Sequence, residues 1–224
     1  MKLSIIVPVI NEATTLPDLL AQLLPLQHDG CEVLLVDGGS SDNSTGLAER
    51  AGLQLIRSQR GRALQMNAGA AQATGEVLLF LHADTRLPEG APDLVTRALS
   101  GKAHCWGRFD VRIAGRHAML RVIGTMMNLR SRWSGIATGD QAMFVSRAVF
   151  ASVGGFPAQP VMEDIELSKR LCRISRPACI RSCVITSGRR WETHGVWRTM
   201  LLMWRLRWHY WRGVPAEQLA KAYR

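Results

Sequence analysis

The sequence predicts an α/β fold in which helices flank a mostly parallel sheet, with a helical appendage at the C-terminus. Two features of the 224-residue chain support this prediction. Short apolar runs alternate with segments of helical periodicity through the first half, and a parallel sheet covered by helices requires this pattern. Beyond about residue 195, aromatic and basic residues recur at helical spacing.

The first half is predicted to hold four strands joined by three helices. The strands are the apolar runs at residues 3–9, 31–37, 53–58 and 76–84. The helices lie between them, at residues 12–26, 45–52 and 62–74. In the first helix leucines recur on one face, and Asn11 is placed to cap its N-terminus.

The second half is less regular. Residues 105–115 alternate between apolar and polar types, which predicts a half-exposed strand, and residues 177–187 read as the last strand. Helices are expected at residues 117–132 and 162–174, and residues 138–156 read as a strand, a short helix and a glycine turn. The helix at 162–174 opens on two carboxylates, whose charge suits the positive end of a helix.

Composition indicates one folded domain. Hydrophobic residues make up 47% of the chain and charged residues 21%, which is enough apolar material for a full core. We expect a main domain at residues 1–194 and a basic amphipathic tail at 195–224. No apolar run reaches the length of a membrane-spanning helix. The N-terminal apolar run gives way to polar residues too early for a signal peptide. Together with five scattered cysteines, this predicts a cytoplasmic protein.

The basic charge is concentrated near the C-terminus. The net charge is +10, and residues 186–224 hold eight basic residues against two acidic ones, so an anionic partner is expected. In the tail one helical face collects aromatic and aliphatic side chains, namely Trp197, Leu201, Trp204, Trp208 and Trp211, beside an arginine stripe. Three interpretations remain open: packing on the body, contact with a second subunit in a homodimer, or peripheral contact with the inner face of the cell membrane.

Polar residues follow three of the predicted parallel strands. Asn11 and Glu12 come after the first, Asp37 after the second and Asp84 after the fourth. We expect them to meet in one crevice, because ligands of open parallel sheets bind at this edge, although either aspartate alone is also typical of an ordinary turn. The phosphate loop GxxxxGK[ST] and a GxGxxG after the first strand are absent. Asp84 is suited to hold Mg²⁺ or Mn²⁺ against a diphosphate.

The motifs that carry these residues resemble a known family. They are "IIVPVINE", "VDGGSSDNST", "RGRALQMNAGAAQATGEVLLFLHADTRLP", "GDQAMFVSR", "VGGFP", "MEDIELSKRL" and "SGRRWE", in order from residue 4 to about 192. In this order they resemble the inverting glycosyltransferases of family 2, which have the Rossmann-like GT-A fold and use nucleotide-diphosphate sugars. More narrowly, the chain resembles the small bacterial subgroup of selenodomain-associated or arsenosugar-biosynthesis transferases.

The resemblance implies a role for each matching residue. Asp164 would be the general base, with Glu163 beside it, while Arg190 and Trp191 would contact the diphosphate or the acceptor. Asp140 would lie near the acceptor, and Asp84, joined by His194, would hold the metal. The nucleotide-sugar would be bound by Pro8, Asn11, Glu12, Asp37, Arg62, Asn67 and Asp84, with Asp37 accepting a hydrogen bond from the base.

The sequence departs from the family pattern at two places. His82 replaces the first aspartate of the DxD motif, and Gly38 replaces the second aspartate of "VDDGS". These changes affect metal affinity and nucleotide preference. Cys179 and Cys183, four residues apart without a second pair, do not indicate a zinc site.

The sequence therefore predicts a metal-dependent, hexosyltransferase-type inverting enzyme that uses a donor, expected to be UDP-linked, and an unidentified acceptor. Two alternatives belong to other classes. An inactive protein of this fold could bind anionic membrane or nucleic acid through its tail, although the retained carboxylates count against it and we expect no nucleic-acid partner. A nucleotidyltransferase would share the nucleotide site, but the glycine-rich, lysine-containing loop it needs is absent.

Overall fold

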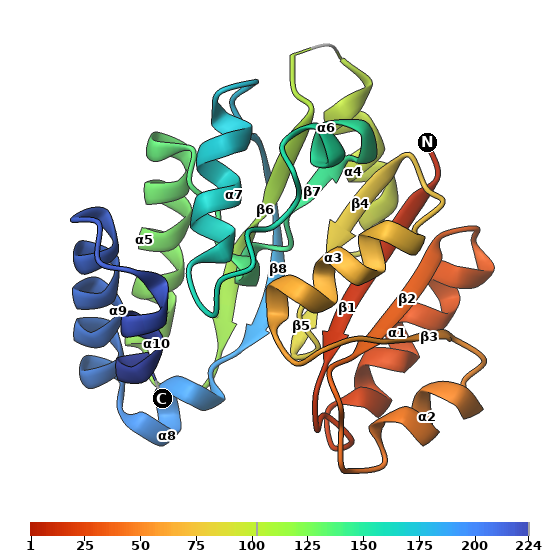
Figure 1. The fold of residues 1–224 in the computed structure, drawn as a ribbon, viewed down its shortest axis with the longest axis horizontal. Helices are drawn as coiled ribbons and strands as arrows, with labels where there is room; N and C mark the ends of the chain where they lie inside the picture. Colours follow the sequence, from red (N-terminus) through yellow and green to blue (C-terminus); the bar gives the residue numbers. More distant parts are fainter. Residues whose placement is uncertain (102, 224) are drawn as a thin grey trace.

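The computed structural model describes residues 1–101 and 103–223. Within them one eight-stranded sheet runs in the order β3-β2-β1-β4-β7-β6-β8-β5. Its first part is parallel throughout (Figure 1): β1 (Leu3–Val9) lies between β2 (Glu32–Asp37) and β4 (Val77–Phe80), and β3 (Gln54–Arg57) lies beside β2. The apolar runs form these strands because both faces of the sheet are covered.

The second part of the sheet contains the reversals. β7 (Phe144–Ser146) is antiparallel to both β4 and β6 (Trp106–Ala114), so β6 runs in the same direction as β4. β8 (Ala178–Ser187) is parallel to β6, and the two-residue β5 (Thr85–Arg86) closes the edge antiparallel to β8. The C-terminal ends of β1, β2, β4, β6 and β8 therefore point to the same edge of the sheet.

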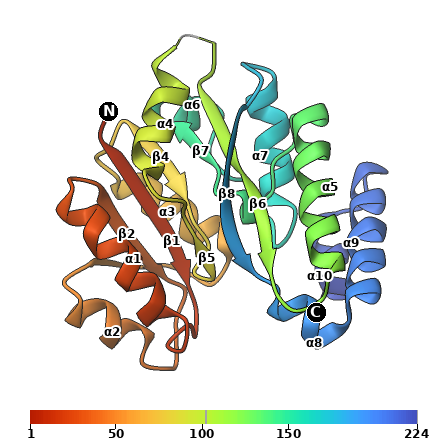
Figure 2. The ribbon, with the colours of Figure 1, turned by 180° about the vertical axis from the view of Figure 1, so that it is seen from behind.

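Helices cover both faces of the sheet (Figures 1 and 2). On one face the core contains residues of α1 (Leu16–His28), α2 (Ser44–Arg50), α4 (Ala91–Ser100) and α5 (Met119–Ser134). On the other face it contains residues of α3 (Arg62–Gln72), α6 (Arg147–Ser152) and α7 (Glu163–Cys172). The strand residues alternate between the two cores, as the pleat requires: Ile5 and Val7 belong to the first and Ile6 to the second.

The C-terminal part is helical, as expected. α8 (Arg189–His194) follows β8 and leads through Gly195 into α9 (Val196–Trp211), and α10 (Ala216–Tyr223) folds back on α9. A small third core joins Leu206 of α9 to Leu219 of α10 and to Val161 before α7. None of the helices in the described part of the chain is long and apolar enough to cross a bilayer.

The α/β class is confirmed, but two local expectations are wrong. Asn11 does not cap the first helix: α1 begins at Leu16 after Thr15, and Asn11 itself has a left-handed backbone with φ of 53°. The strand at 105–115 is not half-exposed along its length. Trp106 to Phe109 are buried, because β6 lies inside the sheet between β7 and β8, and only its second half alternates.

Candidate functional site

The sheet topology brings the candidate residues to one edge. β1, β2 and β4 run parallel, so Asn11, Asp37 and Asp84 follow strands that end on the same side. Because β7 runs the opposite way, the segment just before it, which includes the one-turn helix η1 (Gly139–Gln141), lies at that same edge. The end of β8 also reaches it, where the Ser187 amide donates to the Asp84 carbonyl over 3.2 Å.

Asp37 and Asn11 shape the loop that follows β2. Asp37 is buried, and its carboxylate accepts hydrogen bonds from the amides of Gly39 and Ser40 at 3.0 Å each. The Asn11 side-chain oxygen accepts from the Ser41 amide at 2.8 Å. Glu12 joins the same loop through its amide, which donates to the hydroxyl of Ser44. These polar groups therefore fix the loop in one shape, and Pro8 is half-buried in β1 beneath it.

Asn67 is engaged by the backbone of a distant segment. Its amide nitrogen donates to the Phe156 carbonyl over 2.8 Å, and its amide oxygen accepts from the Phe156 amide over 3.0 Å. Both polar groups of the side chain thus tie α3 to the turn that precedes α7. The structure gives Asn67 this linking role, and its expected place near a ribose or diphosphate stays a prediction.

The acidic pair lies at the N-terminus of α7. Met162, with φ of 65°, turns the chain into the helix, and Glu163 is 5% exposed. Both carboxylate oxygens of Asp164 accept backbone hydrogen bonds, one from Gly139 at 2.9 Å and one from Ile165 at 2.7 Å. These two donors fix the orientation of the Asp164 carboxylate, and each oxygen keeps a second lone pair for a substrate.

Asp140 lies next to the acidic pair and bonds to His82. His82 is buried, and its Nδ1 lies 3.3 Å from Oδ1 of Asp140. Its ring packs on Gly139, where any Cβ would come within 2.4 Å of Nε2, so only glycine fits there. The histidine that replaces the first aspartate of DxD is thus held by Asp140. The structure therefore brings together the segments "HAD" (residues 82–84), "TGDQ" (138–141) and "MEDI" (162–165).

The electrostatics of the cluster perturb two carboxyl groups in opposite directions. Burial raises the pKa of Glu163 to about 7, the charge of Asp164 adds to the rise, and Arg62, with Nη1 4.0 Å from Glu163 Oε1, opposes it. For Asp140 burial also acts to raise the pKa. The hydrogen bond and charge of His82, with the charges of Arg62 and Arg207, outweigh burial, and the net pKa is lowered. Divergent pKa values within one cluster are typical of acid–base sites.

Arginines from three separate helices face these carboxylates. Arg62 begins α3, Arg130 lies on α5 and Arg207 on α9. Burial and the charge of Arg207 lower the pKa of Arg130 to about 10, while Asp164 and Asp140 act to raise it. Nε and Nη2 of Arg130 are buried without a hydrogen-bond partner among the described residues. A buried guanidinium with unused donors, next to a second arginine, is suited to receive an anionic ligand.

Comparison with known proteins identifies the family. The model of the family described as "Glycosyl transferase family 2" matches residues 4–153. The chain is a family 2 glycosyltransferase. The predicted GT-A fold and the family resemblance are confirmed, while the narrower resemblance to the selenodomain-associated subgroup stays a prediction.

Three proteins are similar to this chain, one in sequence and two in fold. The undecaprenyl-phosphate 4-deoxy-4-formamido-L-arabinose transferase of Pseudomonas fluorescens is 34% identical over 61% of this chain and 44% of its own length. The crystal structure of S. aureus TarS with UDP is 22% identical, with a TM-score of 0.67 over 84% of this chain and 60% of that one. The mannosyltransferase PcManGT of Pyrobaculum calidifontis, crystallised with GDP-Man and Mn²⁺, is 22% identical, with a TM-score of 0.60 over 82% and 56%.

The matches span less than two thirds of each of these three proteins. The transferase described here therefore shares with them a fold and a domain. The full activities of those proteins, and what they bind, do not transfer to it.

Structural neighbours have been crystallised with Mn²⁺, and Asp84 is the residue that the sequence predicts as a metal ligand in this chain. Asp84 is half-buried in the turn between β4 and β5, and its Oδ1 accepts from the Thr85 hydroxyl. In the described part of the chain no group of three His, Cys, Asp or Glu side chains gathers as a metal site. A single carboxylate still suits Mg²⁺ or Mn²⁺ when diphosphate oxygens and water complete the shell. The expected second ligand, His194, is exposed, and its Nδ1 faces the carbonyl of Arg190 on its own helix at 3.2 Å.

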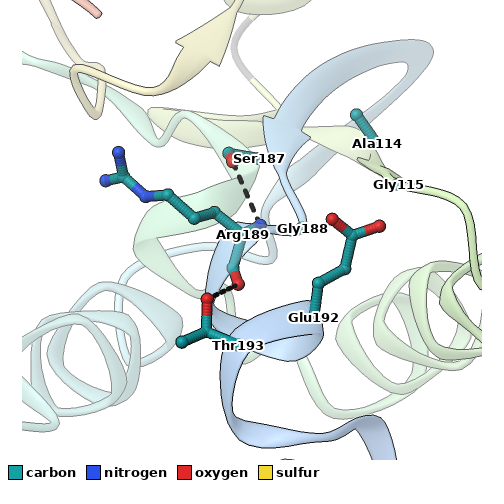
Figure 3. Close-up of a pocket in the computed structure, with 7 residues that line it drawn as sticks. All are labelled: Ala114, Gly115, Ser187, Gly188, Arg189, Glu192 and Thr193. Atoms are coloured by element: carbon teal, nitrogen blue, oxygen red, sulfur yellow. Dashed lines mark hydrogen bonds between the residues drawn. The ribbon is translucent and has the colours of Figure 1, made fainter. Parts of the chain in front are cut away.

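The "SGRRWE" motif lines a cavity of about 480 Å³ at the same edge of the sheet (Figure 3). Gly188 allows the close approach of the chain to the end of β6, because a Cβ there would lie 2.1 Å from the Ala114 carbonyl oxygen. Figure 3 shows Glu192 of α8 beside Gly115, and its Oε1 accepts from the Arg116 amide at 2.7 Å. Arg190 and Trp191 are half-buried on the same helix, and Trp191 packs against the main core. Their expected contact with substrate stays a prediction.

Sequence reasoning missed Arg130 and Arg207. For each of them, the neighbouring residues in the sequence give one indication of an inward position. Arg130 lies next to the buried Ser131 and three residues after the buried Met127, which places it at the margin of the inner face of α5. Arg207 lies off the stripe formed by Arg198, Arg205 and Arg212, next to the buried Leu206. The sequence contains many other arginines, so these two can be recognised only from their positions on helices packed in the folded protein.

Proposed function

We propose that this transferase moves a sugar, with inversion, from a nucleotide-diphosphate donor to an acceptor hydroxyl, with Asp164 as the general base. The observation that carries the proposal is the carboxylate of Asp164, which two backbone amides hold at the sheet edge beside the buried Arg130. A base and an anion-binding group on one site are what an inverting displacement needs.

In this proposal the reaction is a single nucleophilic displacement at the anomeric carbon. The acceptor oxygen forms a bond to the anomeric carbon while its proton passes to Asp164. The bond from that carbon to the diphosphate oxygen breaks, and the electron pair leaves with the nucleoside diphosphate. Glu163, whose pKa is raised to about 7, lies beside the base and keeps the pair from carrying two full charges at neutral pH.

The arginines supply the counter-charge for the leaving group. Arg130 offers buried donors without partners, and Arg62 and Arg207 add positive charge on the same side of the carboxylates. In a water-poor site such pre-placed donors stabilise developing negative charge more than they would in water. A divalent cation at Asp84, when bound, would neutralise the diphosphate further. The half-exposed Asp140 is held by His82, and in this proposal it would contact the acceptor.

We propose UDP as the nucleotide of the donor. This rests on the resemblance to the family and on the sequence motif around Asp37. Structural neighbours have been crystallised with UDP and with GDP-Man, so both bases have to be compared directly.

The test is calorimetric titration of the protein with UDP, GDP and CDP, each with Mn²⁺ and again with EDTA. We expect one diphosphate, UDP, to bind, and to bind more weakly in EDTA. Asp84→Ala should remove this metal dependence, whereas the exposed Glu89→Ala, five residues further along, should keep it. Failure of all three diphosphates to bind would overturn the transferase proposal. A metal effect that survives Asp84→Ala would remove Asp84 from the metal site.

A further inference from the structure

Two neighbouring helices expose apolar stripes to solvent. On α9 the stripe is the one seen in the sequence, Trp197, Leu201, Trp204, Trp208 and Trp211, and all five side chains are more than half exposed. On α5 a second stripe has the same spacing of four, three and four residues, namely Val122, Met126, Leu129 and Trp133. Trp133 is 86% exposed and Trp211 73%. Figures 1 and 2 both show α5 and α9 side by side at one end of the molecule.

Packing on the opposite side fixes which face of each helix is turned outward. α5 buries Leu120, Ile123 and Met127 in the core on the face of the sheet that α1 and α5 cover. α9 buries Val196 in that core and Leu206 against Val161. The tryptophans of the tail therefore do not pack on the body of the protein. An apolar surface of this extent, turned to water by a well-packed helix, is typical of an interaction site.

The acidic and basic side chains on the two helices themselves all have one sign. Neither α5 nor α9 contains an aspartate or a glutamate. Arg121 on α5, and Arg198, Arg205 and Arg212 in and just after α9, are exposed. Tryptophan and arginine on one surface suit the boundary between lipid headgroups and acyl chains, where the rings enter the interface and the guanidinium groups reach phosphates.

We propose that the surface made by the α5 and α9 stripes docks on an anionic lipid bilayer. A second copy of the chain is the less suitable occupant. A symmetric pairing of this surface with itself would bring arginines of one copy against arginines of the other, and neither helix offers a carboxylate to offset the repulsion. A bilayer supplies both the apolar medium and the negative charge.

Docking in this way would place the candidate site beside the bilayer. Arg207 lies two residues after Arg205, about 200° around α9, and its charge acts on Asp140. Arg207 also lies three residues after Trp204 and four before Trp211, so the side of α9 that contributes charge to the acidic cluster borders the stripe that would contact lipid. The binding itself does not depend on the proposed transfer reaction.

The test is flotation of the full-length protein with vesicles of phosphatidylcholine alone or of equal parts phosphatidylcholine and phosphatidylglycerol. We expect the protein to float with the anionic vesicles at low salt, to float much less with the neutral ones, and to be released by high salt. Each of the two interfacial arginines should contribute roughly fivefold to the affinity, so the double substitution Arg198→Gln with Arg205→Gln should weaken binding by more than tenfold.

Separate variants test the two helices. Trp204→Ser with Trp208→Ser removes part of the α9 stripe, and Leu129→Ser with Trp133→Ser removes part of the α5 stripe. Each pair should weaken binding to anionic vesicles at least tenfold. The control is Ile174→Ser, which removes a half-exposed apolar side chain after α7 and should bind as wild type does.

Arg57→Gln with Arg97→Gln is the control for charge, because both arginines are exposed on other elements. Circular dichroism and UDP titration of every variant separate loss of folding from loss of docking. Equal flotation with neutral and anionic vesicles would overturn the proposal. So would unchanged binding of the α5 variant, because the surface would then be α9 alone. A dimer in light scattering that the same substitutions dissociate would assign the surface to self-association instead.

Discussion

Glu163 is a buried carboxyl group whose ionisation its surroundings oppose. Burial, and then the charge of Asp164, raise its pKa from 4.5 to about 7. Because the folded pKa lies above the unfolded one, the folded state binds more protons between these two values, and the free energy of unfolding falls as pH rises through this window. Glu163→Gln removes the titration. The stability of wild type relative to this variant should decline by roughly 1–3 kcal/mol from the lower to the upper end of the window.

Urea unfolding of both proteins at several pH values between 4.5 and 7 measures this difference. Glu166→Gln is the matched control, because Glu166 lies on the same helix and is ion-paired with Lys169 and Arg170 near solvent. The free energy of unfolding of Glu166→Gln should change with pH in the same way as that of wild type. Parallel curves for Glu163→Gln as well would contradict the raised pKa.

Asp164 is expected to act on the transition state rather than on donor binding. Asp164→Asn keeps the shape of the side chain but cannot accept the acceptor's proton, so transfer should fall by roughly 10²–10⁴. UDP affinity measured by calorimetry should stay within about threefold. Glu166→Gln should change neither the rate of transfer nor the affinity for UDP. Equal losses of transfer and of donor affinity would show that Asp164 serves binding and not proton removal.

At the scale of elements, Asn67 joins α3 to the turn that precedes α7. Its side chain satisfies both the amide and the carbonyl of Phe156. Asn67→Ala would leave these half-buried backbone groups unpaired and should lower the free energy of unfolding by about 1–3 kcal/mol. Gln72→Ala on the exposed end of the same helix should cost less than about 0.5 kcal/mol. Urea unfolding compares the two, and an equal effect would argue against a link through Phe156.

The order of strands and helices was predictable where burial is uniform. β1, β2 and β4 are runs of Val, Ile and Leu because both faces of the sheet are covered, and this composition is visible in the sequence. β6 was misjudged because its exposure depends on which strands lie beside it, and the order β7-β6-β8 follows from long-range pairing. The two-residue β5 has too few residues for a periodicity.

The candidate site was predictable only in part. "MEDI" and "TGDQ" were found as motifs, and the structure joins them through the bond between Asp164 and the Gly139 amide. Asn11 was expected at a helix cap, but it holds the loop after β2, because nearby backbone donors there need an acceptor. Arg130 escaped notice because its importance comes from burial next to two carboxylates, which spacing along one helix does not reveal.

Across the whole molecule, positive charge serves two surfaces. The net charge of +10 includes exposed arginines beside the apolar stripes and other arginines, exposed or half-buried, whose charges act on the acidic cluster. α9 carries both kinds, Arg205 outward and Arg207 toward Asp140. Helix α9 is therefore expected to take part in ligand binding, although it lies outside the matched residues 4–153.

A pair of neighbouring substitutions separates these two roles. Arg207→Gln removes a charge from the site and should weaken UDP binding by roughly 10- to 100-fold, since a hydrogen bond to a charged group is worth about 1.5–3 kcal/mol. Arg205→Gln, on the opposite side of the same helix, should leave UDP binding in solution unchanged while weakening flotation with anionic vesicles. Calorimetry and flotation of both variants provide the comparison. If Arg207→Gln bound UDP as wild type does, the tail would contribute only to docking, and Arg62 and Arg130 alone would supply the positive charge for the diphosphate.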